Sequence, residues 1–254
     1  MNNLKLEEMT WPEIETALEN GYRTVIICAA SIEQHGPHLA QLADSAIGEV
    51  SAVDLARRLG NALVAPVIRP GLSSHHMPLP GSLTLRPEIF TGLVEDYVTC
   101  YKTHGFKNIV LISSHGGNFE TLDTIAVDLR SKYADLKIVT GLPLDKLMEL
   151  LGKMEQEENL PPGTCGGHAC DYETSVMLAL YPQHVRTDQA KPGYTGRPTR
   201  EMLNRLYKEG VTTISPTGVI GDPGRASAER GSRYFEMVQA AIHEAVKTAL
   251  ADNS

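Results

Sequence analysis

Four short runs of apolar residues have the length and the β-branched composition that are typical of buried strands. The runs cover residues 23–30, 62–68, 108–113 and 136–142. A strand that is apolar without alternation is buried on both faces, which happens mainly in parallel sheets covered by helices. The pattern therefore predicts a mostly parallel sheet between two layers of helices.

Segments with helical periodicity lie before, between and after these runs. They cover residues 11–20, 46–59, 86–104, 119–133, 144–158, 171–180, 197–209 and 226–251. Thr10 and Gly21 are suitable residues to begin and end the first helix, and Asn118 is suited to cap the fourth. Strands that alternate with helices indicate βαβ units, so we expect a three-layer α/β/α fold in which residues 1–254 form one domain. The loop at 183–197 is either a lid or a subunit contact.

Composition and charge exclude several classes of partner. The chain has 254 residues, of which 42% are hydrophobic, and its formal net charge is -8. Nucleic-acid-binding proteins need a basic face, so this charge argues against nucleic acid as a partner. No apolar run is long enough to cross a membrane or to form the core of a signal peptide, so we expect a cytoplasmic protein without a membrane partner. The four cysteines, at positions 28, 100, 165 and 170, do not have the spacing of a structural zinc site.

The first apolar run ends in a cluster of carboxylates and imidazoles. Glu33-Gln-His35-Gly-Pro-His38 follows it directly, and Asp44 comes soon afterwards. Polar side chains just past the carboxyl end of a strand lie where open α/β sheets bind ligands. Glu33 and His35 are two residues apart, so an extended backbone points both side chains the same way. This mixture of ligand types suits zinc, manganese or iron and does not suit a calcium site.

Two further clusters have the same form. His115 lies in the segment Ser-Ser-His-Gly-Gly-Asn after the third run, and His168 and Glu173 lie in Gly-Gly-His-Ala-Cys-Asp-Tyr-Glu before the sixth helix. A regular helix would turn His168 and Glu173 roughly 140° apart, so we place His168 in the glycine loop and Glu173 in the first turns of the helix. Three clusters of histidine and acid, each at a glycine-bearing loop, predict the site of a metal-dependent hydrolase.

These clusters, in this order and spacing, resemble the motifs of the creatininase (creatinine amidohydrolase) family. Two other segments agree, Met77-Pro-Leu-Pro-Gly-Ser-Leu-Thr84 and Gly218-Val-Ile-Gly-Asp-Pro223, and the resemblance runs from about residue 23 to about residue 230. It implies an α/β hydrolase with a two-metal centre that cleaves cyclic amides, formamides or related bonds. It also implies an assembly of identical subunits, often a hexamer.

The resemblance implies two divalent metal ions in each chain and a set of ligands for them. One ion is expected between Glu33, Asp44 and His115, and the other between His35, Asp44 and a further carboxylate. Asp44 has two oxygens, and such a bridging carboxylate can span two ions about 3.5–4 Å apart.

The further carboxylate departs from the family pattern. Creatininase has it two residues after the histidine that matches His115, where this chain has Gly117. We assign the role to Glu173, as in other branches of the family. Glu120 is the weaker candidate, because it points off the start of a helix.

The resemblance also implies roles for residues that do not hold metal. His168 matches the catalytic histidine, which passes a proton to the leaving atom when a metal-bridged hydroxide attacks a carbonyl carbon. Creatininase places tryptophans around its active site, but the single tryptophan of this chain is Trp11, in the first predicted helix. The loops near the motifs offer hydrogen-bonding residues instead, and we expect these to bind substrate: His75, His76, Ser82, Asp171 and Tyr172. The expected substrate is a small polar cyclic amide or a related C–N compound, and not creatinine.

Two other functions remain compatible with the motifs. The same centre suits a hydrolase that opens the ring of a cyclic polyhydroxy ketone, such as a keto-inositol, by C–C cleavage. A protein that has kept the fold and lost the chemistry is the other possibility. The metal content of the purified protein separates that possibility from the two enzymes, and a comparison of cyclic amides with cyclic ketones separates the enzymes from each other.

Overall fold

A four-stranded parallel sheet forms the centre of the protein. The computed structural model describes residues 3–196 and 199–252. The strands within these residues are β1 (Thr24–Ala29), β2 (Ala62–Val64), β3 (Asn108–Ser113) and β4 (Lys137–Thr140). All neighbouring pairs are parallel, and the order across the sheet is β2-β1-β3-β4. Each apolar run predicted as a strand contains one of them.

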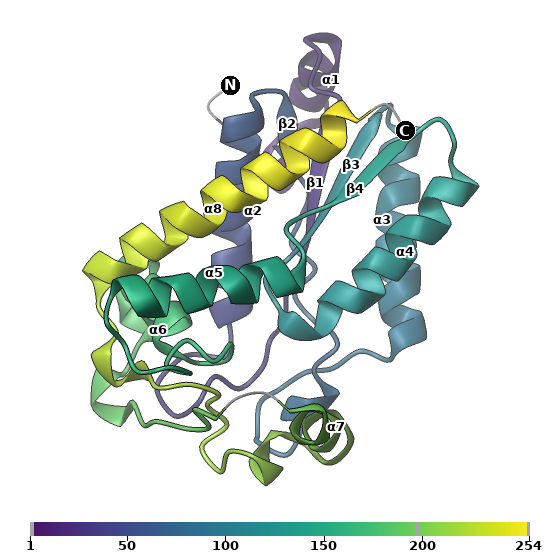
Figure 1. The fold of residues 1–254 in the computed structure, drawn as a ribbon. Coiled ribbons are helices and arrows are strands. Elements are labelled where there is room, and N and C mark those ends of the chain that lie inside the picture. The colour runs from purple at the N-terminus through teal and green to yellow at the C-terminus, as the bar shows by residue number, and fades with distance from the viewer. Residues whose placement is uncertain (1–2, 197–198, 253–254) are drawn as a thin grey trace.

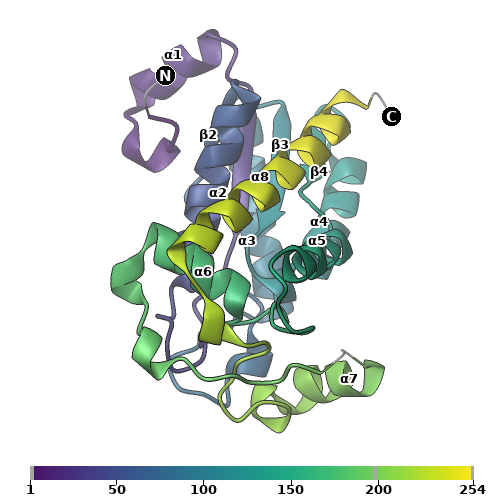
Figure 2. The same cartoon turned by 60° about the vertical axis from the view of Figure 1, so that its left-hand side comes forward.

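Eight α-helices accompany the sheet in the described part of the chain (Figures 1 and 2). They are α1 (Trp11–Glu19), α2 (Ala43–Leu59), α3 (Pro87–Thr103), α4 (Phe119–Lys132), α5 (Leu144–Glu157), α6 (Asp171–Leu180), α7 (Arg200–Glu209) and α8 (Ala228–Ala251). None of the described helices is both long and apolar enough to cross a membrane. Together with the parallel sheet they form the three-layer α/β/α fold that the sequence predicted.

The sheet separates two apolar layers, because successive side chains of a strand point to opposite faces. Val25 and Ile27 of β1 pack in the cluster that contains residues of α1, α3 and α4. Ile26 and Cys28 pack in the cluster that contains residues of α2 and α8. All six residues of β1 are therefore buried, which explains why this run is apolar without alternation.

Two strands are shorter than the runs that predicted them. β2 covers only the first three residues of the predicted 62–68, because Pro66 has no N–H group for a ladder hydrogen bond. The chain returns to β1 at Ile68, whose N–H donates to Cys28 O at 3.0 Å. β4 likewise covers only the central part of the predicted 136–142.

Helix α2 begins at Ala43, three residues earlier than predicted, so Asp44 lies in its first turn. The residue before it is a leucine, which has no side-chain oxygen with which to mark a helix start. Helices α7 and α8 begin later than the predicted residues 197 and 226, directly behind the capping side chains of Thr199 and Ser227. Residue 197 itself lies outside the described part of the chain.

The helix caps show one correct and one wrong prediction. α1 begins directly after Thr10, whose backbone N–H donates to Glu13 Oε2 at 2.6 Å. Asn118 precedes α4, but its side chain does not cap that helix. Its amide group instead donates to Ala29 O and Ala30 O at 3.2 and 3.0 Å. Asn118 therefore ties the start of α4 to the end of β1, a role that depends on a partner far away in the sequence.

Helices α6 and α8 approach closely at Gly231, where a Cβ atom would lie only 1.8 Å from Ser175 O. We expect Gly231→Ala to destabilise the fold by roughly 2–3 kcal/mol or more, because the helices would have to move apart. Gly152→Ala on α5 is the matched control, since no heavy atom of the described residues lies within 4 Å of its Cβ position outside its own helix. Alanine should leave stability there unchanged or raise it by up to about 1 kcal/mol. Urea unfolding measures both, and equal midpoints would contradict the close approach.

Candidate metal centre

The carboxyl ends of β1 and β3 bring the predicted ligands to one edge of the sheet. The two strands are neighbours, with Ala29 opposite Ser113, so the loops that follow them leave the sheet together. The first loop carries Glu33 and His35, and the second carries His115. Helices α6 and α7 lie beyond this edge, whereas α1 lies at the opposite end of the sheet (Figures 1 and 2). The cluster occupies the position where open α/β sheets bind ligands.

Five side chains form two overlapping groups of potential ligands. In the first group, His115 Nδ1 lies 3.2 Å from Glu33 Oε1 and 3.4 Å from Asp44 Oδ2. In the second group, His35 Nε2 lies 3.3 Å from Asp44 Oδ1 and 3.9 Å from Glu173 Oε2. Ligand atoms bonded to a tetrahedral zinc ion are themselves about 3.3–3.6 Å apart. Asp44 contributes one oxygen to each group, so this arrangement fits two ions that share it.

Several atoms of these groups are buried without a hydrogen-bond partner among the described residues. They are Glu33 Oε1, Glu33 Oε2, Asp44 Oδ2 and His35 Nε2. Burial of a carboxylate oxygen without a partner is costly, and a divalent cation would provide that partner. The donor set, carboxylate with imidazole, therefore fits a zinc, manganese or iron centre.

Backbone carbonyl groups orient the two histidines of these groups. His35 Nδ1–H donates to Glu33 O at 3.1 Å, which leaves Nε2 as the acceptor that faces the carboxylates. His115 Nε2–H donates to Leu72 O at 3.1 Å, which leaves Nδ1 as the acceptor. A metal-ligating histidine commonly donates its other N–H to a carbonyl or carboxylate in this way. His35 Nε2 and His115 Nδ1 are therefore the ring nitrogens that face the position of an ion and would bind it after losing their protons.

Burial and the charges of neighbouring side chains shift the pKa values of the acids and histidines in the cluster. Burial alone would raise the pKa of Glu33 and of Asp44, but the histidines beside them hold both pKa values below their usual range. Burial would lower the pKa of His35, yet the Asp44 carboxylate raises it to about 10. Burial raises the pKa of Glu173 to about 7. Bound cations would replace the protons of the histidines, because a histidine that ligates metal is neutral.

Position 117 has no room for a side chain. A Cβ atom there would lie 2.4 Å from Leu72 O and 2.6 Å from His115 Nε2, so a carboxylate two residues after His115 does not fit in this chain. Glu173, in the first turn of α6, lies beside the second group of ligand atoms. Glu120 lies exposed on the first turn of α4. The structure thus offers a reason for the departure from the family pattern.

His168 lies beside the ligand groups, in a loop held by backbone pairing with Ile220. Its Nε2–H donates to Gln34 O at 2.7 Å, so Nδ1 is the nitrogen that faces Glu33 Oε1, at 3.5 Å. Burial, together with the charge of His35, lowers the pKa of His168 to about 3. The neutral ring can accept a proton on Nδ1. It also belongs to two sets of atoms that are close enough to share a metal ion.

Gln34 is a buried site residue that the sequence did not indicate. Its Oε1 accepts a hydrogen bond from Gly36 N–H at 2.9 Å, and its Nε2 donates to Gly218 O at 3.2 Å. The same Nε2 donates to His76 Nδ1 at 2.7 Å. His76 therefore carries its proton on Nε2, which lies 3.2 Å from Glu33 Oε1. The only sequence signal for Gln34 is its position between two predicted ligands.

His75 and His76, predicted to bind substrate, are both buried beside the ligand groups. They lie in a short 3-10 turn after β2, and their ring centroids are 4.1 Å apart. The His76 ring also lies 4.2 Å from the His168 ring, and the His75 ring lies 4.9 Å from that of Tyr207 on α7. Burial lowers the pKa of His75 to about 4 and that of His76 well below its usual range. Both rings are therefore neutral.

The other three residues predicted to bind substrate have structural partners. Ser82 Oγ accepts a hydrogen bond from Gln34 N–H at 3.0 Å. Asp171 Oδ2 accepts one from Arg230 at 2.8 Å. Tyr172 belongs to the apolar cluster between α5, α6 and α8. These contacts connect the loops of the site to the fold.

The chain matches the family model described as creatinine amidohydrolase over residues 7–246. It belongs to the creatininase family. The resemblance seen in the sequence motifs is confirmed over nearly the whole chain.

Relatives in this family carry different names. A mycofactocin precursor peptide peptidase from Mycobacterium ulcerans is 32% identical over 235 residues, which are 87% of this chain and 84% of that protein. A creatinine amidohydrolase from Pseudomonas putida is 28% identical over 255 residues, 94% of this chain and 95% of that protein. A 3-dehydro-scyllo-inosose hydrolase from Thermotoga maritima is 24% identical over 247 residues, 91% and 78% of the two chains. This creatininase-family chain is a hydrolase, and its relatives differ in substrate.

Solved creatininase structures have the same fold. A crystal structure of creatinine amidohydrolase has a TM-score of 0.80 and 26% identity, and the match covers 100% of both chains. A manganese form of creatininase has the same TM-score and identity over 99% of this chain and 100% of that one. A mutant creatininase described as a Zn–Zn type has a TM-score of 0.79.

Glu173 and Glu120 can be distinguished by metal content. We expect Glu173→Ala to lose at least half of the metal bound by the native protein, because a carboxylate of the second group is removed. Glu120→Ala is the matched control on an exposed helix turn and should keep its metal. Elemental analysis after dialysis against metal-free buffer measures both variants. A Glu120→Ala protein that loses metal while Glu173→Ala keeps it would reverse the assignment.

Proposed function

We propose that this protein is a two-metal hydrolase that cleaves the C–N bond of an amide. The ions would be held by Glu33, His35, Asp44, His115 and Glu173. The single observation that carries the proposal is the pair of ligand groups that share Asp44, with buried oxygens that lack hydrogen-bond partners among the described residues. Membership of a hydrolase family supports it.

Each residue of the centre has a task in this reaction. Two divalent cations would supply an acidified water and polarisation of the substrate carbonyl group. Asp44 keeps the two ligand groups together, and the backbone bonds of His35 and His115 keep their acceptor nitrogens aimed at the centre. His76 and Gln34 hold the position of Glu33 and of the His168 loop.

His168 is the residue that we assign to proton transfer. Hydrolysis adds the elements of water across the amide: an oxygen bonds to the carbonyl carbon, the C–N bond breaks, and the nitrogen gains a proton. His168 Nδ1 faces the ligand groups in the unprotonated form, so it accepts a proton from the water and delivers it to the leaving nitrogen. The products are a carboxylic acid and an amine, which at neutral pH become a carboxylate and an ammonium ion as the second proton of the water moves from the acid to the amine.

We propose a peptide or another acyclic amide as the substrate, in addition to the polar cyclic amide expected from the motifs. The mycofactocin precursor peptide peptidase relative is more similar in sequence than the creatinine amidohydrolase relative. Trp11 is 74% exposed on α1, away from the ligand groups, so it does not supply a ring-stacking surface like that of creatininase. No observation favours C–C cleavage of a keto-inositol, for which the relative is less similar.

A direct comparison of substrates tests this proposal. Protein loaded with zinc or manganese would be incubated with short peptide amides, creatinine and a keto-inositol, and the new carboxylate would be measured. We expect metal-dependent hydrolysis of amides that is at least tenfold faster than that of creatinine. Faster opening of the keto-inositol, or amide hydrolysis that persists after chelation of the metal, would contradict the proposal.

Metal binding should stabilise the fold, because an ion that binds only the folded chain raises its free energy of unfolding by about 2.7 kcal/mol at one hundred times its Kd. Zinc or manganese should therefore raise the melting temperature of the native protein. Asp44→Ala removes an oxygen from both groups and should abolish this shift. Asp128→Ala, on the exposed side of α4, is the matched control and should retain it. An undiminished shift in Asp44→Ala would show that the ions bind elsewhere.

The replacement His168→Ala separates proton transfer from metal binding. We expect the variant to keep both ions and to lose roughly 10²–10⁴-fold in kcat, the usual contribution of a general acid or base. His104→Ala, at the exposed end of α3, is the control and should match the native protein. Metal content and kcat are measured on the same preparations. Loss of an ion together with activity would assign His168 as a ligand.

A further inference from the structure

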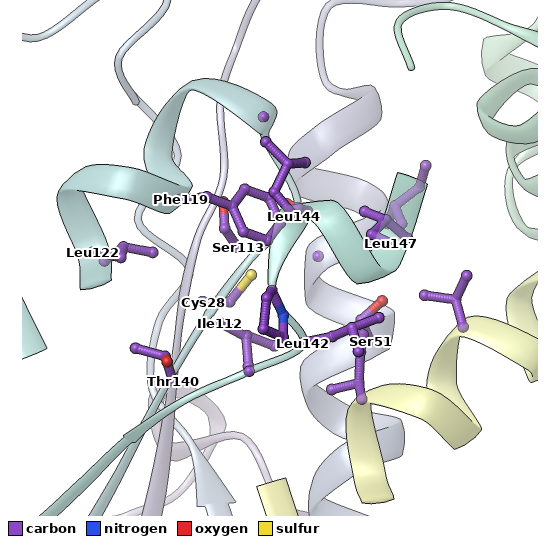
Figure 3. A pocket seen from close by; sticks show the side chains of 18 of the residues that line it. Cys28, Ser51, Ile112, Ser113, Phe119, Leu122, Thr140, Leu142, Leu144 and Leu147 are labelled. Atoms are coloured by element: carbon purple, nitrogen blue, oxygen red, sulfur yellow. The ribbon is translucent and has the colours of Figure 1, made fainter. Parts of the chain in front are cut away.

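An apolar cavity lies between the sheet and helices α5 and α8, next to the metal centre. Its volume is about 100 Å³. Figure 3 shows Leu144 and Leu147 of α5 and Phe119 of α4 facing Cys28 and Ile112 of the sheet. Most of the lining consists of leucine, isoleucine, valine, methionine and glycine from these elements. The sequence did not indicate this apolar lining.

The cavity borders the candidate metal centre at Glu173. Glu173 lines it, and Glu173 Oε2 lies 3.9 Å from His35 Nε2 of the second ligand group. Gly116 and Gly167, which also line it, directly follow His115 and directly precede His168. The cavity therefore borders the two loops that carry these histidines.

The serine hydroxyl groups in the lining are hydrogen-bonded to protein partners. Ser51 Oγ accepts a hydrogen bond from Gln239 at 2.9 Å, and Ser114 Oγ donates to Asp44 O at 2.8 Å. Ser113 Oγ donates to the backbone. Apart from Glu173, the only charged residue in the lining is Asp123, which is exposed. This mainly apolar lining offers few hydrogen-bond partners to a polar group, which would lose its hydrogen bonds to water on entering the cavity.

Two glycines line the part of the cavity beside the loops of His115 and His168. Both Gly116 and Gly167 are exposed. A Cβ atom at position 116 would meet no heavy atom of the described residues within 4 Å, and one at position 167 would meet only Met148, at 3.5 Å or more. Both positions thus leave room for a side chain beside the loops that carry His115 and His168.

We propose that this cavity is the specificity pocket of the enzyme and takes a branched aliphatic side chain next to the scissile amide. The assignment rests on the proposed amide hydrolysis at the adjacent metal centre. A dry apolar cavity of about 150 Å³ can hold benzene, so 100 Å³ suits a group of three or four carbon atoms. The pocket selects a residue such as leucine or valine in a peptide-like substrate and rejects a hydroxyl-rich ring.

Binding of simple hydroxamates to the zinc-loaded protein tests the pocket separately from catalysis. Hydroxamates bind the metal through their two oxygens, so acetohydroxamate, 3-methylbutanohydroxamate and 3-hydroxybutanohydroxamate differ only in the group that enters the cavity. The three extra carbon atoms of the branched probe should tighten binding roughly 50-fold over acetohydroxamate. The hydroxylated probe should gain no more than about threefold, because its hydroxyl group would be buried without a partner. Titration calorimetry measures the three dissociation constants.

Two variants locate the preference in the cavity. Gly116→Leu adds a side chain to the lining of the cavity and should reduce the ratio between the branched and the methyl probe to roughly threefold or less, with metal content checked on the same sample. Leu147→Ala enlarges the cavity and should shift the preference from 3-methylbutanohydroxamate to phenylacetohydroxamate by about tenfold. Gly92→Leu on α3, where a Cβ atom is also free of contacts among the described residues, is the control and should keep the native ratio.

The outcomes separate the pocket from the reaction. Equal affinity of the native protein for the branched and methyl probes would overturn the assignment of the cavity as a specificity pocket. A preference for the branched probe that survives in both Gly116→Leu and Leu147→Ala would also overturn it. A native preference that both variants change supports it. If that preference holds and no amide is hydrolysed, the proposed reaction fails and the pocket stands.

Discussion

Two buried carboxylates, Glu33 and Asp44, impose the constraint on which the rest of the site depends. Their unpartnered oxygens are stable in the interior only beside positive charge, because an isolated carboxylate loses far more hydration energy than the fold can replace. His35 and His115 carry that charge as protons until ions replace it. Backbone carbonyl groups fix the orientation of both rings. The protonated histidines and the metal-binding histidines can therefore have the same ring orientation.

The scaffold positions these groups through backbone contacts that tolerate little change. Asn118 joins the end of β1 to the segment after β2, since it donates to Ala29 O and Ala30 O and accepts from Leu72 N–H. Gly117 allows the chain to pass Leu72 O so closely that no side chain fits. A carboxylate does not fit at that position, and the carboxylate of Glu173 at the start of α6 lies beside the second ligand group.

The candidate site has two walls of different chemistry. One wall is formed by neutral histidines, His75, His76 and His168, whose rings lie close together. The other is the apolar cavity between the sheet and α5. The polar wall suits the reacting carbonyl group and the proton transfer, whereas the apolar wall suits an inert side chain.

The sequence by itself determined the α/β class, the strands and the segments that meet at the sheet edge, because apolar periodicity and short ligand motifs are local properties. Tertiary structure decided the rest. Gln34 enters the site through bonds to Gly218 and His76, and Glu173 reaches His35 only when α6 packs against the loop after β1. The apolar cavity arises from several elements at once. Contacts between residues far apart in the chain leave no local pattern, so the sequence did not indicate this cavity.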